Sequence, residues 1–289
     1  MRYDSHLRAF KKEGSTLTMG ITRKAWITYH DTLTLKLTDP IAIVGAPGLR
    51  SVGKIAVELL IEQLQPRLYA EIYSYGFPGV YYGPSYLGAP SHAGGLTTKD
   101  QLTELPSVKI YIADPKSGSG TADREFVLIS GYQAYDPLNQ HMVVDRVTDV
   151  LKALGVKRVF SLGAQVIESG MTCCATDTNV LDEMARYGIT QTHVDRFIGF
   201  SGLIAALAMM KGIEGVCLFS STTQNFEDPE YPDLDAAQEL VLRIAEILGL
   251  QVDSADLEQL LGEEQEPAES ETAGARERKP YTEDLDGYG

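Results

Sequence analysis

The sequence predicts an α/β protein: a single three-layer domain with a mostly parallel or mixed sheet and helices on both faces. Two observations indicate this class. Short apolar runs alternate with longer amphipathic segments along most of the 289 residues, which is typical of strand–helix units. Some runs, such as "IAIVG" at residues 41–45, are apolar throughout, so we expect them to be covered on both sides.

The first half of the chain supplies four expected strands and two helices. Strands are expected at residues 41–45, 68–75, 108–114 and 125–131, and helices from about residue 51 and from residue 137 to residue 154. Ser51 is the expected cap of the first helix, and Asp136 of the second, which opens on a proline. Residues 115–124 have the composition of a hairpin loop.

The second half continues the alternation. Strands are expected at residues 158–164 and 215–221, and helices at about 180–187, 201–212, 235–249 and 254–261. Ser201 is the expected cap of the apolar helix "SGLIAALAMMKG", and Gly212 ends it. The polar loop at residues 220–235 is either an active-site loop at strand ends or a solvated connection in which Asp233 caps the next helix. The second interpretation is favoured.

Composition divides the chain into three parts. Residues 1–24 are expected to form a flexible extension, with Met19 as an alternative start, and residues 25–261 form the α/β body. Residues 262–289 carry nine acidic and three basic side chains and too few apolar ones to build a core. They predict a disordered acidic tail with a reach of about 30 Å.

The overall charge excludes several classes of function. A net charge of -15 argues against nucleic acid and against an anionic membrane surface as partners. No segment reaches the apolar length of a membrane span, and the N-terminus lacks a secretory signal. Three cysteines, two of them adjacent at Cys173 and Cys174, suit neither a disulfide framework nor a tetrahedral metal site. We therefore expect a cytoplasmic protein without a metal.

A glycine-rich turn follows the first expected strand. The segment "GLRSVGK", which contains Gly48, Gly53 and Lys54, matches the first seven positions of a phosphate-binding P-loop. The eighth position should supply a hydroxyl for magnesium, but Ile55 stands there. We interpret Gly45, Gly48 and Gly53 as a tight strand-to-helix turn, with Lys54 as a weak candidate for an anion contact and no cofactor expected.

No catalytic set emerges from the other motifs. "GFSGL" at residues 199–203 resembles a nucleophile elbow, but Leu203 occupies the position of the required glycine. The five histidines are scattered, and no pair has metal-ligand spacing. A Ser/His/Asp set that assembles only in space remains an open alternative.

The order of several segments resembles the proteasome assembly chaperone family, of the type-2 kind with its archaeal relatives. The resemblance runs from about residue 41 to residue 261 and rests on "IAIVGAPGLRSVGKIAVELLIEQL", "FVLISGYQAYDP", "RVFSLGA", "CCATDTNVLDEMARYGI", "IGFSGLIAALAMMKGIEG" and "DAAQELVLRIAEILGLQVDSADLEQLL". It implies a nucleoside-phosphorylase-like α/β fold, a tendency to form homo-oligomers and no established enzymatic activity.

The resemblance also gives the chain terminus a meaning. Proteins that dock on the core proteasome often end in a hydrophobic residue, a tyrosine and any residue, and their free carboxylate enters a pocket between α subunits. Tyr288 matches the tyrosine and Gly289 supplies the carboxylate, but Gly287 stands where the hydrophobic residue belongs. We expect these three residues to bind proteasome α subunits or related assembly factors.

Two classes of function therefore follow from the sequence. The first is a binding protein that chaperones proteasome assembly or docks on the α-ring, and the second is a small-molecule enzyme acting on a nucleotide or nucleoside. A self-interface is expected at the apolar helix around residues 203–210 and at the loop with Tyr81, Tyr82 and Tyr86. The alternative is that these residues serve the core of one monomer.

Overall fold

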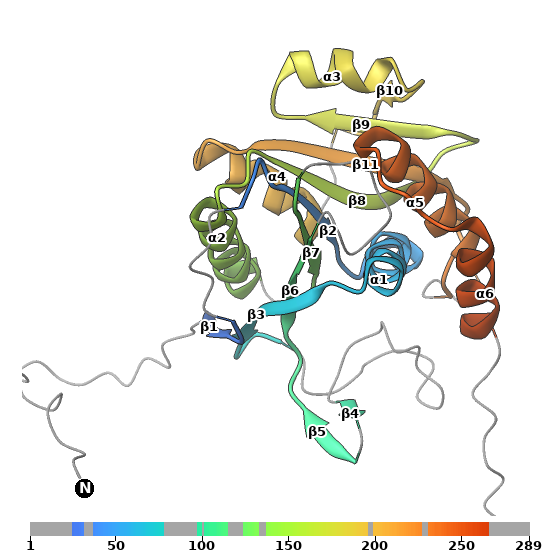
Figure 1. Cartoon of the computed structure of the whole chain (residues 1–289). Coiled ribbons are helices and arrows are strands. Elements are labelled where there is room, and N and C mark those ends of the chain that lie inside the picture. The colour runs from blue at the N-terminus through green and yellow to red at the C-terminus, as the bar shows by residue number, and fades with distance from the viewer. Residues whose placement is uncertain are drawn as a thin grey trace, which may run out of the picture.

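The computed structural model describes residues 25–31, 37–77, 97–99, 101–114, 124–132, 137–195, 199–226 and 231–265 (Figure 1). The N-terminal extension, the loop with Tyr81, Tyr82 and Tyr86, and the C-terminal residues Gly287 to Gly289 lie outside these described residues.

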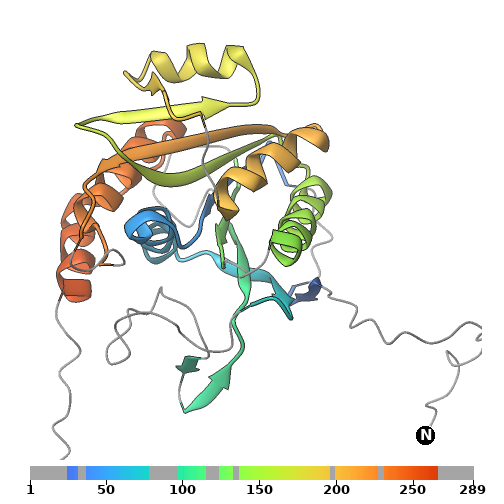
Figure 2. The ribbon, with the colours of Figure 1, turned by 180° about the vertical axis from the view of Figure 1, so that it is seen from behind.

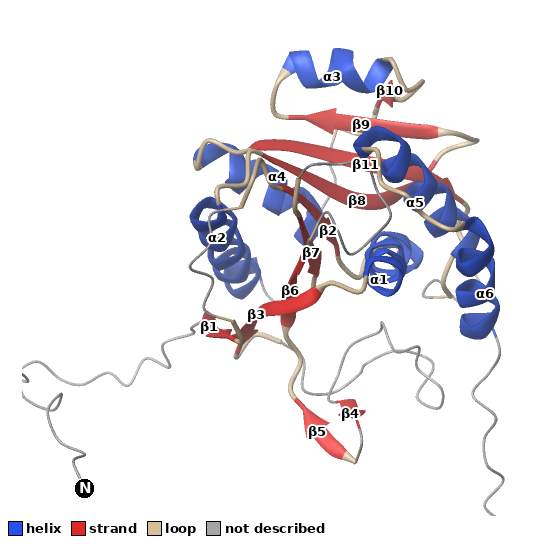
Figure 3. Ribbon diagram, viewed as in Figure 1, coloured by secondary structure: helices blue, strands red, loops and turns tan. Residues whose placement is uncertain are grey.

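A nine-stranded sheet forms the centre of the described structure, in the order β1-β3-β6-β7-β2-β8-β11-β9-β10 (Figure 3). Its strands are β1 (Ala25–Tyr29), β2 (Ile41–Gly45), β3 (Arg67–Ser74), β6 (Val108–Ala113), β7 (Phe126–Ser130), β8 (Arg158–Val166), β9 (Met171–Ala175), β10 (Thr190–Gln191) and β11 (Glu214–Thr222). Two further strands, β4 (Thr97–Lys99) and β5 (Leu102–Glu104), form a separate ribbon.

The sheet is mixed, as the sequence predicts. Strands β7, β2, β8 and β11 run parallel and occupy its middle. Strand β1 pairs antiparallel with β3, β3 with β6, and β6 with β7. Strand β9 pairs antiparallel with β11 and parallel with β10. The antiparallel pairing of β6 with β7 confirms the expected hairpin.

Helices cover both faces of this sheet, which confirms the predicted three-layer class. Helices α1 (Val52–Leu64), α5 (Leu234–Leu248) and α6 (Ser254–Gln265) lie on one face, and α2 (Pro137–Leu154) and α4 (Phe200–Met210) on the other (Figures 1 and 2). Helix α3 (Thr178–Ala185) packs beside β9 near the edge of the sheet. Each face has its own hydrophobic cluster, one containing Phe160 and the other Phe200.

Several helix ends differ from the sequence prediction. Ser51 adopts a left-handed conformation with φ 54°, and its side chain makes no capping hydrogen bond. Ser201 is the second residue of α4, and Gly199 holds the N-cap position instead. Asp233 does cap α5, because its side chain accepts a hydrogen bond from the backbone N–H of Ala236, as predicted. Helix α6 continues to Gln265, beyond the expected end near residue 261.

Candidate functional site

The carboxyl ends of the parallel strands β2, β7, β8 and β11 meet at one edge of the sheet. From this edge the chain leaves β2 into α1 on one face and leaves β7 into α2 on the other. Such a switch point is where open α/β sheets bind ligands. Two basic side chains, Arg50 and Lys54, lie here, so this edge is the first place to look for a small-molecule site.

Two glycines allow the start of α1 to press against the sheet. A Cβ atom on Gly45 would lie 1.8 Å from the carbonyl oxygen of Gly53, and one on Gly53 would lie 2.1 Å from the carbonyl oxygen of Leu162. Gly48 is different, because the nearest atom to its Cβ position is 3.8 Å away. The close approach of α1 to β2 and β8 therefore depends on Gly45 and Gly53.

Lys54 lies in the first turn of α1 with a buried side chain, and its ammonium is enclosed by oxygen acceptors. Its Nζ atom donates to the Ser130 hydroxyl and, at 3.2 Å, to the carbonyl oxygen of Gly131. The carboxylate of Glu58, one helical turn later, lies 3.0 Å away. An anion that bound Lys54 would have to displace these three partners, so the geometry favours a structural role for this lysine.

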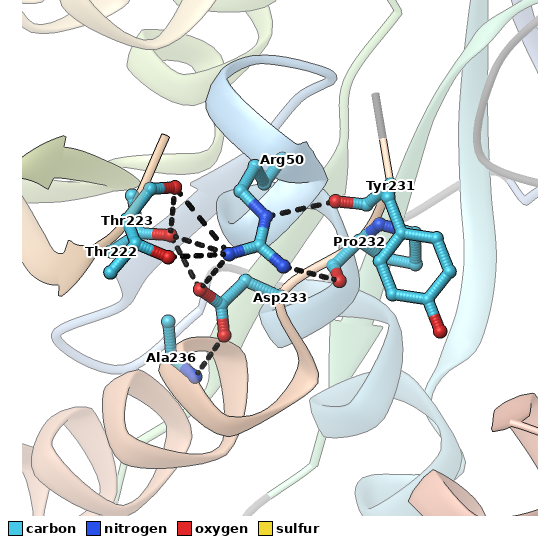
Figure 4. Close-up of polar contacts among 7 residues, drawn as sticks. All are labelled: Arg50, Thr222, Thr223, Tyr231, Pro232, Asp233 and Ala236. Carbon is cyan, nitrogen blue, oxygen red and sulfur yellow. Dashed lines mark hydrogen bonds and ion pairs between the residues drawn. The ribbon is translucent and has the colours of Figure 1, made fainter. Parts of the chain in front are cut away.

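Arg50 joins the turn before α1 to the loop before α5 (Figure 4). Its guanidinium donates to the carbonyl oxygens of Tyr231 at 3.0 Å and Pro232 at 3.2 Å. The same group donates to the Thr223 hydroxyl at 3.2 Å and to the Asp233 carboxylate at 2.8 Å. The Arg50 backbone is left-handed, with φ 47° and ψ 28°, a conformation that is uncommon for a residue with a side chain.

Asp233 connects three elements through one carboxylate. Its Oδ2 atom accepts hydrogen bonds from Arg50 and from the Thr222 hydroxyl at the end of β11. Its Oδ1 atom accepts from the backbone N–H of Ala236 at 3.1 Å, inside the first turn of α5. We call Arg50, Thr222, Thr223 and Asp233 the Arg50 latch. Sequence reasoning missed Arg50, because its partner lies 183 positions away and no local pattern marks the contact.

The paired groups limit what this edge of the sheet can do chemically. Arg50 is held by a carboxylate and backbone oxygens, and Lys54 by a carboxylate, a hydroxyl and a carbonyl. The part of the chain that the structure describes contains no group of three or more His, Cys, Asp or Glu side chains able to hold a metal ion. Within the same residues, none of the helices has the length and apolar character to cross a membrane. The arrangement fixes two loops and two helices in place.

Helix α4 presents an apolar surface of a different kind. Phe200, Ile204, Ala205 and Ala208 pack inward, while residues Met209 and Met210 are 52% and 78% exposed. Leu203 and Leu207 are only half-buried. We call Leu203, Leu207, Met209 and Met210 the α4 surface. A helix that is apolar on every side is normally buried on every side, so this surface is available to another protein.

The family of the chain follows from comparison with known proteins. A model described as the PAC2 family matches residues 42–269, which is more than half of the sequence. The chain belongs to the PAC2 family. The expected resemblance is thereby confirmed. An uncharacterized protein of Methanocaldococcus jannaschii is 23% identical over 231 residues, which cover 77% of this chain and 79% of that protein.

Solved structures share the fold. PbaB of Pyrococcus furiosus, described as an archaeal proteasome activator, is 20% identical with a TM-score of 0.67, covering 83% of this chain and 95% of PbaB. PbaA of the same organism, described as an archaeal homolog of proteasome-assembly chaperone, is 18% identical with a TM-score of 0.59, covering 83% and 96%. A Mycobacterium tuberculosis proteasome-assembly chaperone homologue, Rv2125, is 19% identical with a TM-score of 0.57, covering 81% and 96%. At these identities the likeness shows a common fold.

Proposed function

We propose that this PAC2-family chain is a non-enzymatic cytoplasmic binding protein that chaperones proteasome assembly or docks on the proteasome α-ring. The observation that carries the proposal is the fold shared over almost the whole length of PbaB and PbaA, which are described as a proteasome activator and an assembly-chaperone homolog. The proposed partners are proteasome α subunits or related assembly factors.

The geometry of the switch point supports a binding protein over the alternative of a nucleotide or nucleoside enzyme. A phosphate group is normally held by basic side chains and free N–H groups at a helix N-terminus. Here Arg50 and Lys54 already have partners inside the protein. Both would have to release several hydrogen bonds before they could contact a substrate, which weakens binding by the energy of those lost contacts.

The α4 surface supports a second part of the proposal, that the protein acts as a homo-oligomer. Water contact with Met209 and Met210 is unfavourable, and burial of a methionine side chain is worth about 1.5–3 kcal/mol. A second copy of the chain presents the same surface, so two copies related by a twofold axis can cover each other. An oligomer would also carry several C-terminal tails to a ring-shaped partner and raise their effective concentration.

The last three residues are the proposed docking signal. Tyr288 would enter a pocket between α subunits, and the carboxylate of Gly289 would meet a basic side chain there. Gly287 lacks the hydrophobic side chain expected at its position. We therefore propose a tail that binds weakly by itself and gains strength when several copies bind together.

Binding of the full chain to surface-immobilised, assembled proteasome α-rings of the same organism tests this function. Tyr288→Ala should weaken binding, and so should one residue appended after Gly289, which moves the carboxylate and leaves every side chain intact. Gly287→Leu should tighten binding by about 1 kcal/mol or more per tail, because it fills the hydrophobic pocket. Tyr281→Ala is the matched control, since it removes a tyrosine from the same segment without altering the last three residues.

Each contrary result has a separate meaning. Equal affinity for all four variants would reject the tail as a docking signal and move the binding to the folded body. No binding of the unmodified chain, together with Mg-dependent ATP binding that Lys54→Ala abolishes, would overturn the proposed function in favour of a nucleotide enzyme. Calorimetry with ATP and magnesium measures this second outcome directly.

A further inference from the structure

Two cysteines face each other across neighbouring strands on the α4 side of the sheet. Cys174 on β9 and Cys217 on β11 are register partners in an antiparallel pair, so their side chains leave the sheet on the same face. Both belong to a small cluster with Ala205 of α4 and Phe219 of β11. Both are free thiols in the structure.

The register fixes the distance between the two backbones. The backbone N–H of Thr176 donates to the carbonyl oxygen of Gly215 on the same pair of strands, at 2.9 Å. Hydrogen-bonded pairs recur every two residues along an antiparallel ladder, which makes Cys174 and Cys217 a hydrogen-bonded pair with Cα atoms about 5.5 Å apart. That Cα separation falls within the range of about 4.4–6.8 Å that a disulfide bridge spans. The Cβ atoms of such a pair lie about 5.5 Å apart, so the two strands must move about 1 Å closer before the bridge can form, which makes it strained and easily reduced.

The environments of the two thiols differ in a way that assigns them roles. Cys217 is buried opposite Cys174 on the neighbouring strand. Interaction with the Cys217 thiol lowers the pKa of Cys174, which is half-buried, while interaction with Cys174 and burial raise the pKa of Cys217. A thiolate is the reactive form of cysteine, so Cys174 is the group that an oxidant meets first.

Cys173 does not share this site, although it is next in sequence. Successive side chains on a strand point to opposite faces, and Cys173 packs in the cluster on the α1 side of the sheet. Burial raises the pKa of its thiol to about 11. The chain therefore contains a natural internal control for any reaction of the pair.

We propose that Cys174 and Cys217 form a reversible cross-strand disulfide when the protein meets a peroxide. The Cys174 thiolate attacks one oxygen of hydrogen peroxide, the O–O bond breaks, and a sulfenic acid forms while the departing hydroxide takes a proton to become water. The Cys217 sulfur then attacks the sulfenic sulfur, its proton leaves with the hydroxyl group as a second water, and the S–S bond forms. Both sulfurs are oxidised, and the peroxide is reduced.

The bridge would join the two ends of a segment that contains α3, β10 and α4. Tying these ends together restricts the unfolded chain and stabilises the folded state. Because Ala205 of α4 packs against Cys217 of β11, the same bond would also hold the sheet beneath α4 in place. The bridge itself does not depend on the proposed function. An effect of the bridge on self-association rests on the proposed homo-oligomer.

Peptide mapping of the full chain after treatment with hydrogen peroxide tests the bridge. We expect the free thiols, titrated in denaturant, to fall from three to one. We also expect a mass loss of two hydrogen atoms, a linked peptide joining Cys174 to Cys217, and full reversal by dithiothreitol. The melting temperature should rise by several degrees without reductant and return to its starting value with it.

Three variants make the result specific. Cys173→Ser should keep the linked peptide and the rise in melting temperature, while Cys174→Ser and Cys217→Ala should lose both; circular dichroism checks that each one is folded. Three free thiols after oxidation, a Cys174 sulfinic acid without a bridge, or a disulfide between two copies of the chain would each overturn the proposal. The mapping of the unaltered chain decides the question even if a variant fails to fold.

Discussion

Helices α1 and α4 pack on opposite faces of the same sheet and use their surfaces in opposite ways. The start of α1 lies against β2 and β8 with no room for a Cβ on Gly45 or Gly53, and its lysine is paired within the protein. Helix α4 is apolar on nearly every side, yet Met209 and Met210 remain exposed. The contrast is that the start of α1 finds its partners within the chain, whereas α4 keeps apolar side chains exposed.

This difference changes where function is expected in the molecule. The switch point of an α/β sheet is the usual ligand site. Here its two basic side chains, Arg50 and Lys54, are already paired within the protein. Met209 and Met210 of α4 expose apolar side chains on the other face of the sheet from α1, and exposed apolar surfaces mark contacts with other proteins. Substitutions on the α1 side of the sheet test whether its residues depend on the partners that the fold gives them.

Gly53→Ala should have the largest effect on stability. Its new Cβ would lie 2.1 Å from the carbonyl oxygen of Leu162, which is a backbone atom that cannot rotate away. We expect the free energy of unfolding to fall by about 3 kcal/mol or more, because α1 must shift along its length. Gly48→Ala is the control and should be nearly neutral, since its nearest neighbour is 3.8 Å away. Urea denaturation measures both, and equal losses would contradict the packing account.

Asp233→Ala should have an intermediate effect. It removes the cap of α5 and leaves the mostly buried guanidinium of Arg50 without its carboxylate. Loss of a cap is worth about 1 kcal/mol and loss of the partner adds to it, so we expect a total of about 2–3 kcal/mol. The exposed Asp235, two residues later in the same turn, gives the matched control Asp235→Ala. If both variants lost the same stability in thermal denaturation, the latch would have no structural role.

Glu71 on β3 should give the smallest effect on stability, and that effect should depend on pH. Burial acts to raise the pKa of its carboxyl, but hydrogen bonds from Ser107, Tyr73 and His30 outweigh burial and lower it. A lowered pKa contributes stability that is present above the ordinary value of 4.5 and is lost as pH falls through the lower folded value. Glu71→Gln should therefore lower the free energy of unfolding at neutral pH. The difference from the unaltered protein should shrink as the pH falls below 4.5.

The matched substitution for this test is Glu258→Gln on the exposed side of α6. Urea unfolding curves recorded from pH 7 downward give the free energy of unfolding of each variant. A stability difference between Glu71→Gln and the unaltered protein that stays constant with pH would show that the carboxylate network makes no ionic contribution. The same constancy is expected for the α6 control.

Much of the fold could be predicted because its central strands carry strong local signals. Strands β2, β7, β8 and β11 are short apolar runs, and the helices between them end at glycines such as Gly155 and Gly212, which have positive φ. The cap at Asp233 was also predictable, since an aspartate precedes an amphipathic segment. Strands β1, β9 and β10 were not predicted, because short strands that complete a sheet edge depend on pairing with distant strands.

The candidate site was far less predictable. The P-loop-like motif drew attention to Lys54, but its hydrogen-bond acceptor Ser130 lies 76 positions away in the sequence. The Arg50 latch and the Cys174–Cys217 pair likewise depend on the register and order of strands, which appear only in three dimensions. The last three residues, Gly287 to Gly289, lie outside the described residues, so their role stays a prediction.

Light scattering of the full chain at micromolar concentration tests the central claim that α4 is completed by another protein. We expect a mass that is a multiple of 31.6 kDa, and a fall toward 31.6 kDa in Met210→Glu, whose carboxylate would be buried in the interface. Ala255→Glu adds the same charge on exposed α6 and should leave the mass unchanged. A mass of 31.6 kDa for the unaltered chain would contradict the account, because the α4 surface would then stand open in solution.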